Sequence, residues 1–324
     1  MTARLRGALA RRLLHVGVVV WAGYTLTYAL LFLLPSDPVS IMVGPENVVA
    51  DADVARLRDE LGLDDPWWSR YLGGLAQAVT GDLGTSHATG APVTGTILAA
   101  LPSTATIAVA ALVIGVLAGT ALALVAGTST GRLRDLVLAL PSLALSMPTF
   151  WIGIVLLQLF SFRLPWFPAG GTGSVGSAVL PVVCLAIPAT ALVAQVLATR
   201  LVAVMDEPFV ETARGLGSTR ARVAVRHALR NAFSPALSMI GLLAGWLVSG
   251  AVVVETVFSR PGIGRLVHDA VSTQDRPMVL GLVTVSTLVF AVGALLTDLL
   301  QPVLDPRLDD TASARVDDEA RPLS

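Results

Sequence analysis

Six apolar segments, each long enough to cross a lipid bilayer, constrain this chain more than any other feature. A spanning helix needs about 20 mostly apolar residues, because each residue advances about 1.5 Å through a hydrocarbon core of about 30 Å. The six segments cover residues 13–34, 104–127, 136–160, 178–199, 232–254 and 278–299. Only 14% of the 324 residues are charged. We predict an all-α polytopic membrane protein with six transmembrane helices.

The arginines predict the orientation of these helices. All 22 basic residues are arginine, and cytoplasmic flanks of membrane proteins carry an excess of basic residues. With the N-terminus inside, 15 arginines fall in cytoplasmic segments and seven outside. Arginines also precede the first apolar segment, as in a signal peptide, but its apolar core is long and has no clear cleavage site. We therefore predict a retained first helix and cytoplasmic termini.

Several kinds of functional site are disfavoured, because the chain lacks the residues that they need or has only one of them. Without lysine, the chain cannot form a P-loop, whose lysine contacts the nucleotide phosphates. Cys184 is the only cysteine, and the four histidines are far apart in sequence, so we expect no disulfide and no metal site. The apolar segments are nearly free of ionisable residues, which disfavours an ion-coupled carrier. Glu255 lies at the outer end of the fifth segment and Asp298 near the inner end of the sixth. Energy for transport would have to come from a partner.

The connection between residues 206 and 234 is the longest predicted cytoplasmic loop. Gly215 and Gly217 interrupt it, so we predict two short helices over residues 207–214 and 218–231, the second capped by Ser218. Arg222, Arg226 and Arg230 follow at four-residue spacing on one face of the second helix. This stripe fits either an anchor on lipid headgroups or a protein-docking surface.

The predicted outer loop, residues 36–100, is acidic, and we expect short helices in it. Asp65 and Pro66 are typical of a helix N-cap and first position, ahead of Trp67, Trp68 and Tyr71. These aromatic residues suit the outer membrane interface or packing within the loop. Four prolines, Pro141, Pro148, Pro181 and Pro188, are expected to interrupt the third and fourth spans. Gly115 and Gly119 predict close helix packing.

Several short runs of residues resemble the motifs of a known protein family. The run ETARGLG, residues 211–217, resembles the EAA signature of the membrane subunits of ABC importers, and HALRNAFSP, residues 227–235, is similar to its form in the dipeptide, oligopeptide and nickel branch. His227 and Leu229-Arg230 depart from the general signature. Further similar runs occur in order: LPSDPV (34–39), LGLDDPWWSRYL (61–72), GDLGTS (81–86), LPST (101–104), VVVETVFSRPGIGRLV (252–267), DRPMVLG (275–281) and LDPR (304–307). The long first outer loop resembles that of the B-type subunit.

The resemblance implies two functional loops. In that family the EAA loop is a coupling helix that enters a cleft of an ATPase subunit. This implies ATPase docking by Glu211, Thr212, Ala213, Arg214, Gly217, Arg222 and Arg226, with Glu211, Ala213 and Gly217 matching the signature itself. On the outer side, Glu255, Phe258, Pro261, Gly262 and Gly264 match the family's ETVFSxPGxG motif. They imply a re-entrant loop at the outer mouth; the alternative is a tight Pro-Gly turn without a gating role.

The resemblance also implies a type I importer permease fold, a bacterial-type plasma membrane location and a set of partners. These are a second six-span permease (C-type), two P-loop ATPases that bind the ATP and Mg, an extracytoplasmic substrate-binding protein and membrane lipid, but no nucleic acid. The chain itself would bind no cofactor and would not be an enzyme. We expect di- or oligopeptides as the solute; nickel, glutathione or another small solute remain alternatives, and a non-transporting scaffold is a further one.

The expected organisation has four parts. Residues 1–34 form the cytoplasmic N-terminus and first span, and residues 35–100 form the extracytoplasmic loop. Residues 101–306 form the permease core with the coupling loop at 207–231. Residues 307–324 form an acidic cytoplasmic tail, which we expect to be disordered because it is rich in charged residues.

Overall fold

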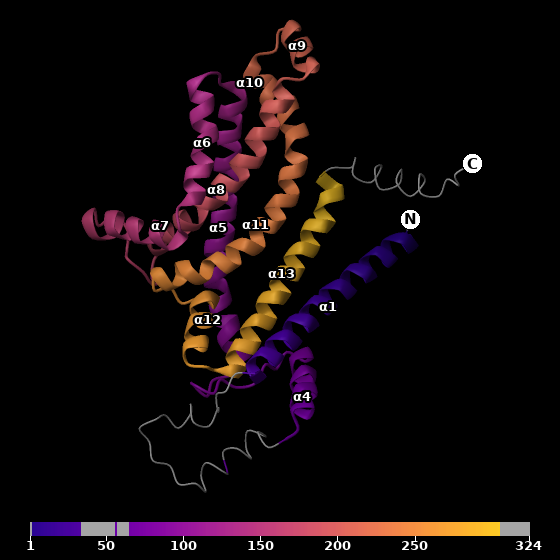
Figure 1. The fold of residues 1–324 in the computed structure, drawn as a ribbon, viewed down its shortest axis with the longest axis vertical. Helices are drawn as coiled ribbons and strands as arrows, with labels where there is room; N and C mark the ends of the chain where they lie inside the picture. Colours follow the sequence, from indigo (N-terminus) through magenta and orange to yellow (C-terminus); the bar gives the residue numbers. More distant parts are fainter. Residues whose placement is uncertain (1, 34–55, 57–64, 305–324) are drawn as a thin grey trace. The chain divides into compact units, whose positions relative to one another are not determined.

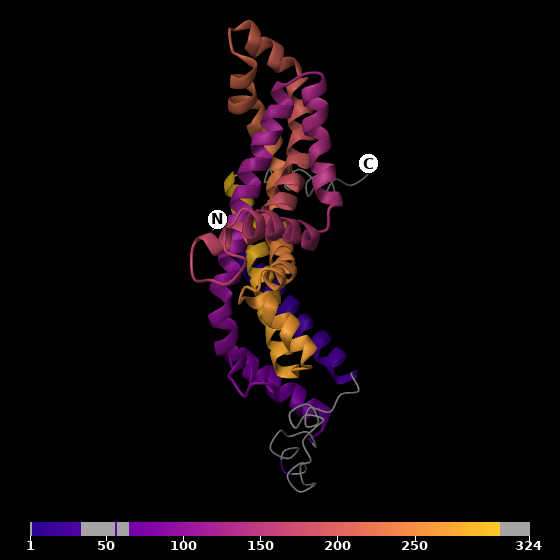
Figure 2. The same cartoon turned by 90° about the vertical axis from the view of Figure 1, so that its left-hand side faces the viewer.

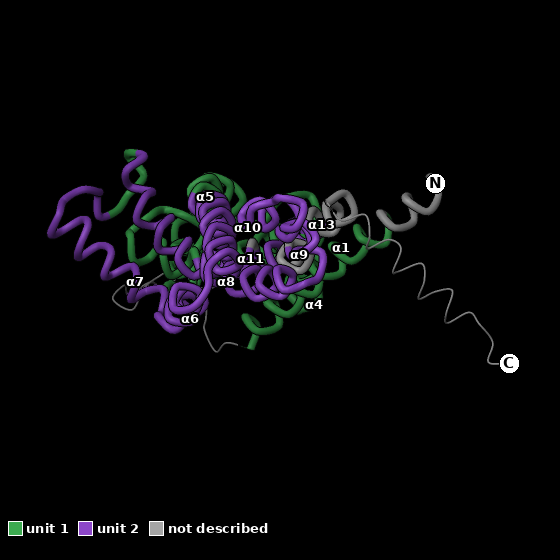
Figure 3. Tube along the Cα trace, turned by 90° about the horizontal axis from the view of Figure 1, so that it is seen from above, with its two compact units in different colours: residues 1–106, 170–174, 251–291 green, residues 107–169, 175–250, 292–324 purple. Residues whose placement is uncertain are grey.

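The computed structural model describes residues 2–33, 56 and 65–304, drawn as ribbon in Figure 1. The predicted tail and much of the predicted outer loop lie outside the described residues. The chain divides into two compact units, coloured in Figure 3. Unit 1 comprises Met1–Thr106, Gly170–Ser174 and Ala251–Ala291, and unit 2 comprises Ile107–Ala169, Val175–Gly250 and Val292–Ser324. Each unit is described by itself below.

Five helices are long and apolar enough to cross a membrane. They are α1 (Thr2–Leu33), α5 (Val93–Thr128), α8 (Gly176–Met205), α11 (Leu229–Val257) and α13 (Arg276–Leu304). Large apolar side chains on these helices are exposed, including Leu26 at 64% and Leu117 at 66%. Exposed apolar surface of this kind belongs in lipid. Five of the six predicted spans are therefore confirmed as single helices.

The third predicted span is not a single helix. It is divided into α6 (Arg132–Ser146) and a second segment made of α7 (Thr149–Leu156) and the π-helix η1 (Leu157–Arg163), with a bend of 96° between the two segments. Figures 1 and 2 both show α7 running across the direction of α6 and α8. The break falls at Met147 and Pro148, whose ψ angles of 127° and 135° are extended. A proline disfavours helical backbone at the residue before it, which explains the position of the break.

The other three prolines of the third and fourth spans lie inside helices, so the prediction that they interrupt these spans is wrong. Pro141 lies within α6, and Pro181 and Pro188 lie within α8. All three are buried. In the interior of a helical bundle, neighbouring groups and small backbone adjustments accommodate the lost hydrogen bond.

Small residues bring α5 and α8 together in unit 2, as the sequence predicts. A Cβ atom added to Gly115 would lie 2.7 Å from the Cβ of Ala189, and one added to Gly119 would lie 2.7 Å from the Cβ of Val193. These distances leave no room for a larger side chain, so the two backbones approach closely at this point. Helix α6 packs along α8, and the buried residues of this region include Ala123, Leu197, Leu201 and Val223.

In unit 1, helix α4 (Trp67–Val79) packs against α1 through a cluster of tyrosines. The Tyr71 ring lies 5.9 Å from that of Tyr24 and 5.3 Å from that of Tyr28. Trp21 Nε1 donates a hydrogen bond of 3.0 Å to the Tyr71 hydroxyl, whereas Trp67 is 57% exposed. Tyr71 therefore packs against α1, and Trp67 has the exposure expected of an interfacial residue.

The predicted cap of α4 is wrong by one residue. Pro66 occupies the N-cap position, no side chain caps the helix, and the helix begins at Trp67. The Pro66 carbonyl accepts bonds from the backbone N–H groups of Ser69 and Arg70, at 2.9 and 3.3 Å. Pro66 has a ψ of 137°, so its backbone is extended and not helical.

Candidate functional site

The 207–231 loop, which carries the EAA-like run, is attached to the core of unit 2 by one face of a short helix. Helix α9 (Pro208–Gly215) places Val210 at 4% exposure in the same apolar cluster as Leu201 and Met205. Phe209 and Ala213 pack against this cluster from the side. Glu211, Thr212 and Arg214 lie on the exposed side of α9. The apolar positions thus attach α9 to the core, and the polar positions leave its other face exposed to solvent.

Gly217 has a conformational role within this loop. Its φ of +87° lies in the left-handed region, and its N–H donates to the Arg214 carbonyl at 2.9 Å. Ser218 N–H donates to the Ala213 carbonyl at 3.1 Å. This pair of bonds is a Schellman motif, in which glycine is the preferred residue after the helix end. The glycine of the signature is therefore required by the turn itself.

The N-cap of the second predicted helix of the loop lies one residue later than expected, and the helix is divided. Helix α10 (Arg220–Val223) is capped by Thr219, whose hydroxyl accepts a bond of 3.3 Å from Arg222 N–H; Ser218 does not cap it. The π-helix η2 (Ala224–Ala228) joins α10 to α11. Ser218 belongs to the Schellman turn, so the N-cap of α10 is Thr219 and its first helical residue is Arg220.

The exposed groups of the loop surround a shallow hollow of about 550 Å³. It is lined by Glu211, Arg214, Gly215, Gly217, Ser218, Thr219 and Arg220. Thr212, Arg222 and Arg226 are exposed outside it, and Ala213 is only partly exposed. The structure thus brings Glu211, Arg214 and Gly217 together but turns Ala213 partly toward the core.

Two features of this loop were missed by the sequence analysis. Leu216 is 84% exposed at the turn, although exposing an apolar side chain to water is unfavourable. The Arg220 side chain donates from Nε and Nη2 to the Gly127 carbonyl, at 3.3 and 3.2 Å, and so ties the loop to the end of α5. Nothing in the local sequence distinguishes Arg220 from the exposed arginines, because its partner lies 93 residues away.

The second predicted loop, residues 255–264, is built around a buried carboxyl group in unit 1. Glu255 has no exposed surface. Its Oε2 accepts bonds from Gly264 N–H at 2.7 Å and Arg265 N–H at 3.2 Å, and its Oε1 accepts one from the Thr104 hydroxyl at 2.6 Å. The first two donors belong to the first turn of α12 (Ile263–Ser272), where N–H groups have no partner within the helix. Glu255 therefore caps α12 from outside it.

The glycines of this loop are required by close approach. A Cβ atom on Gly262 would lie 2.2 Å from Glu255 Oε1, and one on Gly264 would lie 2.3 Å from Val252 Cα. Phe258 is buried at 1% exposure, whereas Pro261 is exposed. The loop is thus a tightly packed turn, and a gating role for its residues remains a prediction.

Thr104 completes this buried hydrogen-bond arrangement, and the sequence analysis did not single it out. It ends the LPST run, donates to Glu255 and accepts a bond of 2.8 Å from Ile263 N–H. Arg260 was also missed: it is 5% exposed and donates from Nη1 to the Gly171 carbonyl at 3.2 Å. The clue to Thr104 in the sequence was its position in the LPST run, which is one of the runs that carry the resemblance.

Two further runs of the resemblance meet at Asp275, which is 2% exposed. Asp275 begins the DRPMVLG run and accepts a short hydrogen bond from the hydroxyl of Ser86, the last residue of GDLGTS. It also accepts bonds from His87 N–H at 3.2 Å and from Met278 N–H, in the first turn of α13, at 3.3 Å. This carboxylate joins the 81–93 segment to the start of α13.

His87, beside this contact, makes the stability of unit 1 dependent on pH. Burial lowers the pKa of His87 below its ordinary value of 6.5; Asp275 opposes this shift, and Arg276 adds to it. The unfolded chain then takes up the proton first as pH falls below about 6.5, so stability decreases toward acid pH. We expect the melting temperature to fall less between about pH 7.5 and about pH 5.5 in His87→Gln than in the unaltered protein. Equal decreases would contradict this prediction, and the exposed His268→Gln serves as the control.

Comparison with known proteins places these features in a family. The model of the binding-protein-dependent transport system inner membrane component matches residues 115–310, and the model of the N-terminal region of the same kind of membrane component matches residues 5–108. The glutathione transport system permease protein GsiC of Escherichia coli (strain K12) is 33% identical over 300 residues, which covers 92% of this chain and 97% of GsiC. The di/tripeptide transport system permease protein DppB of Pseudomonas aeruginosa (strain UCBPP-PA14) is 35% identical over 331 residues, covering 93% of this chain and 98% of DppB.

Among solved structures, a chain of the MetNI methionine ABC transporter in an inward-facing conformation is similar, with a TM-score of 0.55 and 12% sequence identity. The similarity covers 64% of this chain and 96% of that one. At this identity the likeness supports the fold, and it agrees with the importer permease architecture that the sequence predicts. The chain belongs to the family of binding-protein-dependent transport system inner membrane components, the membrane-spanning permease subunits of bacterial ABC importers.

Proposed function

We propose that this permease moves short peptides into the bacterial cytoplasm as part of an ATP-driven importer. The observation that carries the solute class is the similarity to DppB and GsiC along almost the whole of each protein. The solutes in the names of these two relatives, di- and tripeptides and glutathione, are all short peptides. The lining of the transport path in this chain would decide among such solutes.

The proposed mechanism is alternating access driven by partner proteins. Two ATPases would close on ATP and Mg, and their clefts would move the exposed side of the 207–231 loop, with Glu211 and the Schellman turn at the contact. Because α9 is attached to the core through Val210, a displacement of α9 would pass to the α5–α8 pair. A second permease and an extracytoplasmic binding protein complete the assembly, with both termini of this chain in the cytoplasm.

Reconstitution tests this proposal. The chain, its second permease, two ATPases and the binding protein would be placed in liposomes, and uptake of a labelled dipeptide or tripeptide would be measured. We expect uptake only with ATP and only when this chain is present, and no ATP hydrolysis by the purified chain alone. An ion-coupled carrier would give the opposite pattern, with uptake that collapses on adding an uncoupler while ATP is maintained.

A further inference from the structure

Unit 1 has a pocket of about 570 Å³ between α5 and α12, to which the proposed function gives no role. This volume falls within the range of roughly 300–1,000 Å³ that is typical of ligand pockets. Pro261 and Gly262, from the second predicted loop, form part of its lining. With both termini in the cytoplasm, as proposed above, α5 begins on the extracytoplasmic side, from which a binding protein would deliver the solute.

One wall of the pocket is a face of α5 with small side chains. Ala99, Ala100, Ser103 and Thr106 recur there at helical spacing, and their small size leaves the space beside them open. Thr106 donates its hydroxyl proton to the Pro102 carbonyl at 2.7 Å. The Thr106 oxygen therefore presents lone pairs as acceptors, which suit the N–H groups of a peptide.

The opposite wall is one face of α12, and it carries charges of both signs. Arg265 and Asp269 lie about one helical turn apart, with 3.7 Å between Arg265 Nε and Asp269 Oδ2. Their side chains are 43% and 55% exposed, so a ligand can reach both charged groups. Arg265 N–H donates to Glu255 at 3.2 Å, and this bond holds the start of α12 in place.

The existing partners of this pair leave it open to a ligand. Arg265 pairs with Asp269, whose Oδ1 lies 3.2 Å from His268 Nδ1. All three side chains are about half exposed, and ion pairs in that setting are weak because water and salt screen them. A ligand with one negative and one positive group can replace the pair with two ion pairs of its own. Arg260 also lines the pocket, but it is buried and bonded to the Gly171 carbonyl.

The spacing of the two charged residues fits a dipeptide. Four residues of an α-helix advance about 6 Å along its axis, and two extended residues of a peptide span about 7 Å. Once the Arg265–Asp269 contact opens, its two groups can therefore lie as far apart as the carboxylate and the ammonium group of a dipeptide.

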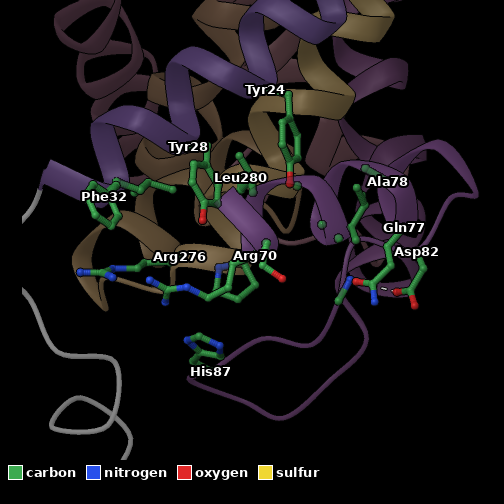
Figure 4. A pocket seen from close by; sticks show the side chains of 18 of the residues that line it. Tyr24, Tyr28, Phe32, Arg70, Gln77, Ala78, Asp82, His87, Arg276 and Leu280 are labelled. Atoms are coloured by element: carbon green, nitrogen blue, oxygen red, sulfur yellow. Dashed lines mark hydrogen bonds between the residues drawn. The ribbon is translucent and has the colours of Figure 1, made fainter. Parts of the chain in front are cut away.

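Another pocket of unit 1, of about 550 Å³, provides a comparison. It lies among α1, α4 and the start of α13, and Figure 4 shows side chains that line it. It also contains an arginine and an aspartate, Arg70 and Asp82, but Figure 4 shows Asp82 apart from the Arg70 guanidinium group. Arg70 is half-buried, like Arg265, and Asp82 is exposed, like Asp269, so these two residues are matched controls.

We propose that the pocket between α5 and α12 receives a short zwitterionic peptide, with its carboxylate at Arg265 and its ammonium group at Asp269. The small residues of α5 leave room for the side chains of the peptide. This inference rests on the proposed function, which supplies short peptides as the solute class. It adds the residues that recognise the two ends of the solute.

Saturation-transfer difference NMR on the full-length purified chain tests the proposal, because it detects weak binding without a transport assay. Alanylalanine, its C-terminal amide and its N-acetyl derivative are titrated separately. We expect half-saturation with alanylalanine at a roughly tenfold lower concentration than with either derivative, because each derivative loses one charge-assisted contact. Equal binding of the three compounds by the unaltered protein would overturn the proposal.

Two variants assign each end of the peptide to its residue. In Arg265→Gln, alanylalanine should bind no better than its amide but still better than the acetyl derivative, and Asp269→Asn should show the reverse. Arg70→Gln and Asp82→Asn, in the pocket of Figure 4, should keep both preferences. Loss of a preference in these controls, or survival of both preferences in Arg265→Gln and Asp269→Asn, would refute the site.

Filling the pocket without changing a charge is a second test. Ala99→Phe should weaken the binding of alanylalanine roughly tenfold, whereas Ala105→Phe, at an exposed position of α5 outside the lining, should not. Equal binding by the two variants would place the peptide elsewhere. Full displacement of alanylalanine by acetate at equal ionic strength would refute a peptide as the occupant.

The reconstituted uptake assay separates this inference from the proposed function. Uptake by the assembled transporter, with no binding preference in this chain, would reject the pocket and leave the proposed function standing. Absence of uptake, with the preferences intact, would reject the transport function and leave the binding site standing.

Discussion

Replacing Glu211 with alanine is expected to abolish uptake by the assembled transporter while leaving the permease folded and in the membrane. Glu211 is exposed on α9 and lines the hollow of the 207–231 loop, and its side chain makes no hydrogen bond or ion pair with the other described residues. Removing the Glu211 carboxylate should therefore change the stability of this chain little. The effect of the substitution should appear in the binding of a partner. A central contact in a protein interface contributes about 2 kcal/mol or more, which corresponds to a roughly 30-fold weaker association.

The measurement is co-purification of the ATPases with the permease, together with peptide uptake in reconstituted liposomes. Glu207→Ala is the matched control, because Glu207 is an exposed glutamate of the same loop whose side chain does not cap α9. Normal uptake by Glu211→Ala would sink the docking role of this residue. Loss of uptake in both variants would show a general effect of charge and not one of Glu211.

Gly217 extends this test by separating backbone strain from partner contact. A Cβ atom on Gly217 meets nothing within 4 Å, so a side chain there costs the chain only the strain of its φ of +87°. Asparagine tolerates this conformation better than other residues with a side chain, whereas a β-branched residue does not. We expect both Gly217→Asn and Gly217→Val to lose uptake, with only the valine variant losing much stability. Uptake retained in Gly217→Asn would assign the glycine to the turn alone.

Replacing Glu255 with alanine is expected to give the largest loss of stability, about 3 kcal/mol. The Thr104 hydroxyl and the N–H groups of Gly264 and Arg265 would lose their acceptor in a buried region. Glu255→Gln keeps one acceptor oxygen and should lose less. Thermal unfolding of the purified protein and protease cleavage near residues 258–265 are the measurements.

Asp269→Ala is the control for this prediction. Asp269 lies in α12, and its Oδ2 is 3.7 Å from Arg265 Nε, but the side chains of both residues are about half exposed. Exposed ion pairs contribute little, so this variant should melt within about 1 kcal/mol of the unaltered protein. If Glu255→Ala unfolded at the same temperature as Asp269→Ala, the capping role of the carboxyl group would be wrong.

Glu211 and Glu255 show how much the motifs alone could predict about a residue's role. The resemblance pointed to Glu211 and Glu255 alike, as glutamates that begin recognisable runs. Glu211 proves to be exposed on an attached helix, as a docking residue must be, whereas Glu255 is enclosed by Thr104 and the first turn of α12. A motif identifies a residue but does not say whether its side chain faces a partner or its own chain.

Local sequence also failed where a helix end depended on competing bonds. Ser218 and Thr219 are both suitable N-caps, and the choice between them follows from the Schellman turn at Gly217, which uses the Ser218 N–H. The bend at Pro148 and the continuation of α8 through Pro181 and Pro188 show the same dependence. A proline weakens a helix everywhere, but its neighbours decide whether the helix breaks.

The sequence by itself determined the membrane-spanning helical class, the positions of five spans, the family and the two loops that carry its motifs. These depend on composition, on runs of about 20 apolar residues and on short runs of fixed order, all of which are local properties. Only the tertiary structure decided the break in the third span and the roles of Thr104, Arg220 and Asp275. Each of these joins residues far apart in the chain: 151 positions separate Thr104 from Glu255, and 189 separate Ser86 from Asp275. Such pairs leave no periodic pattern in the sequence, because their contact exists only after the helices have packed.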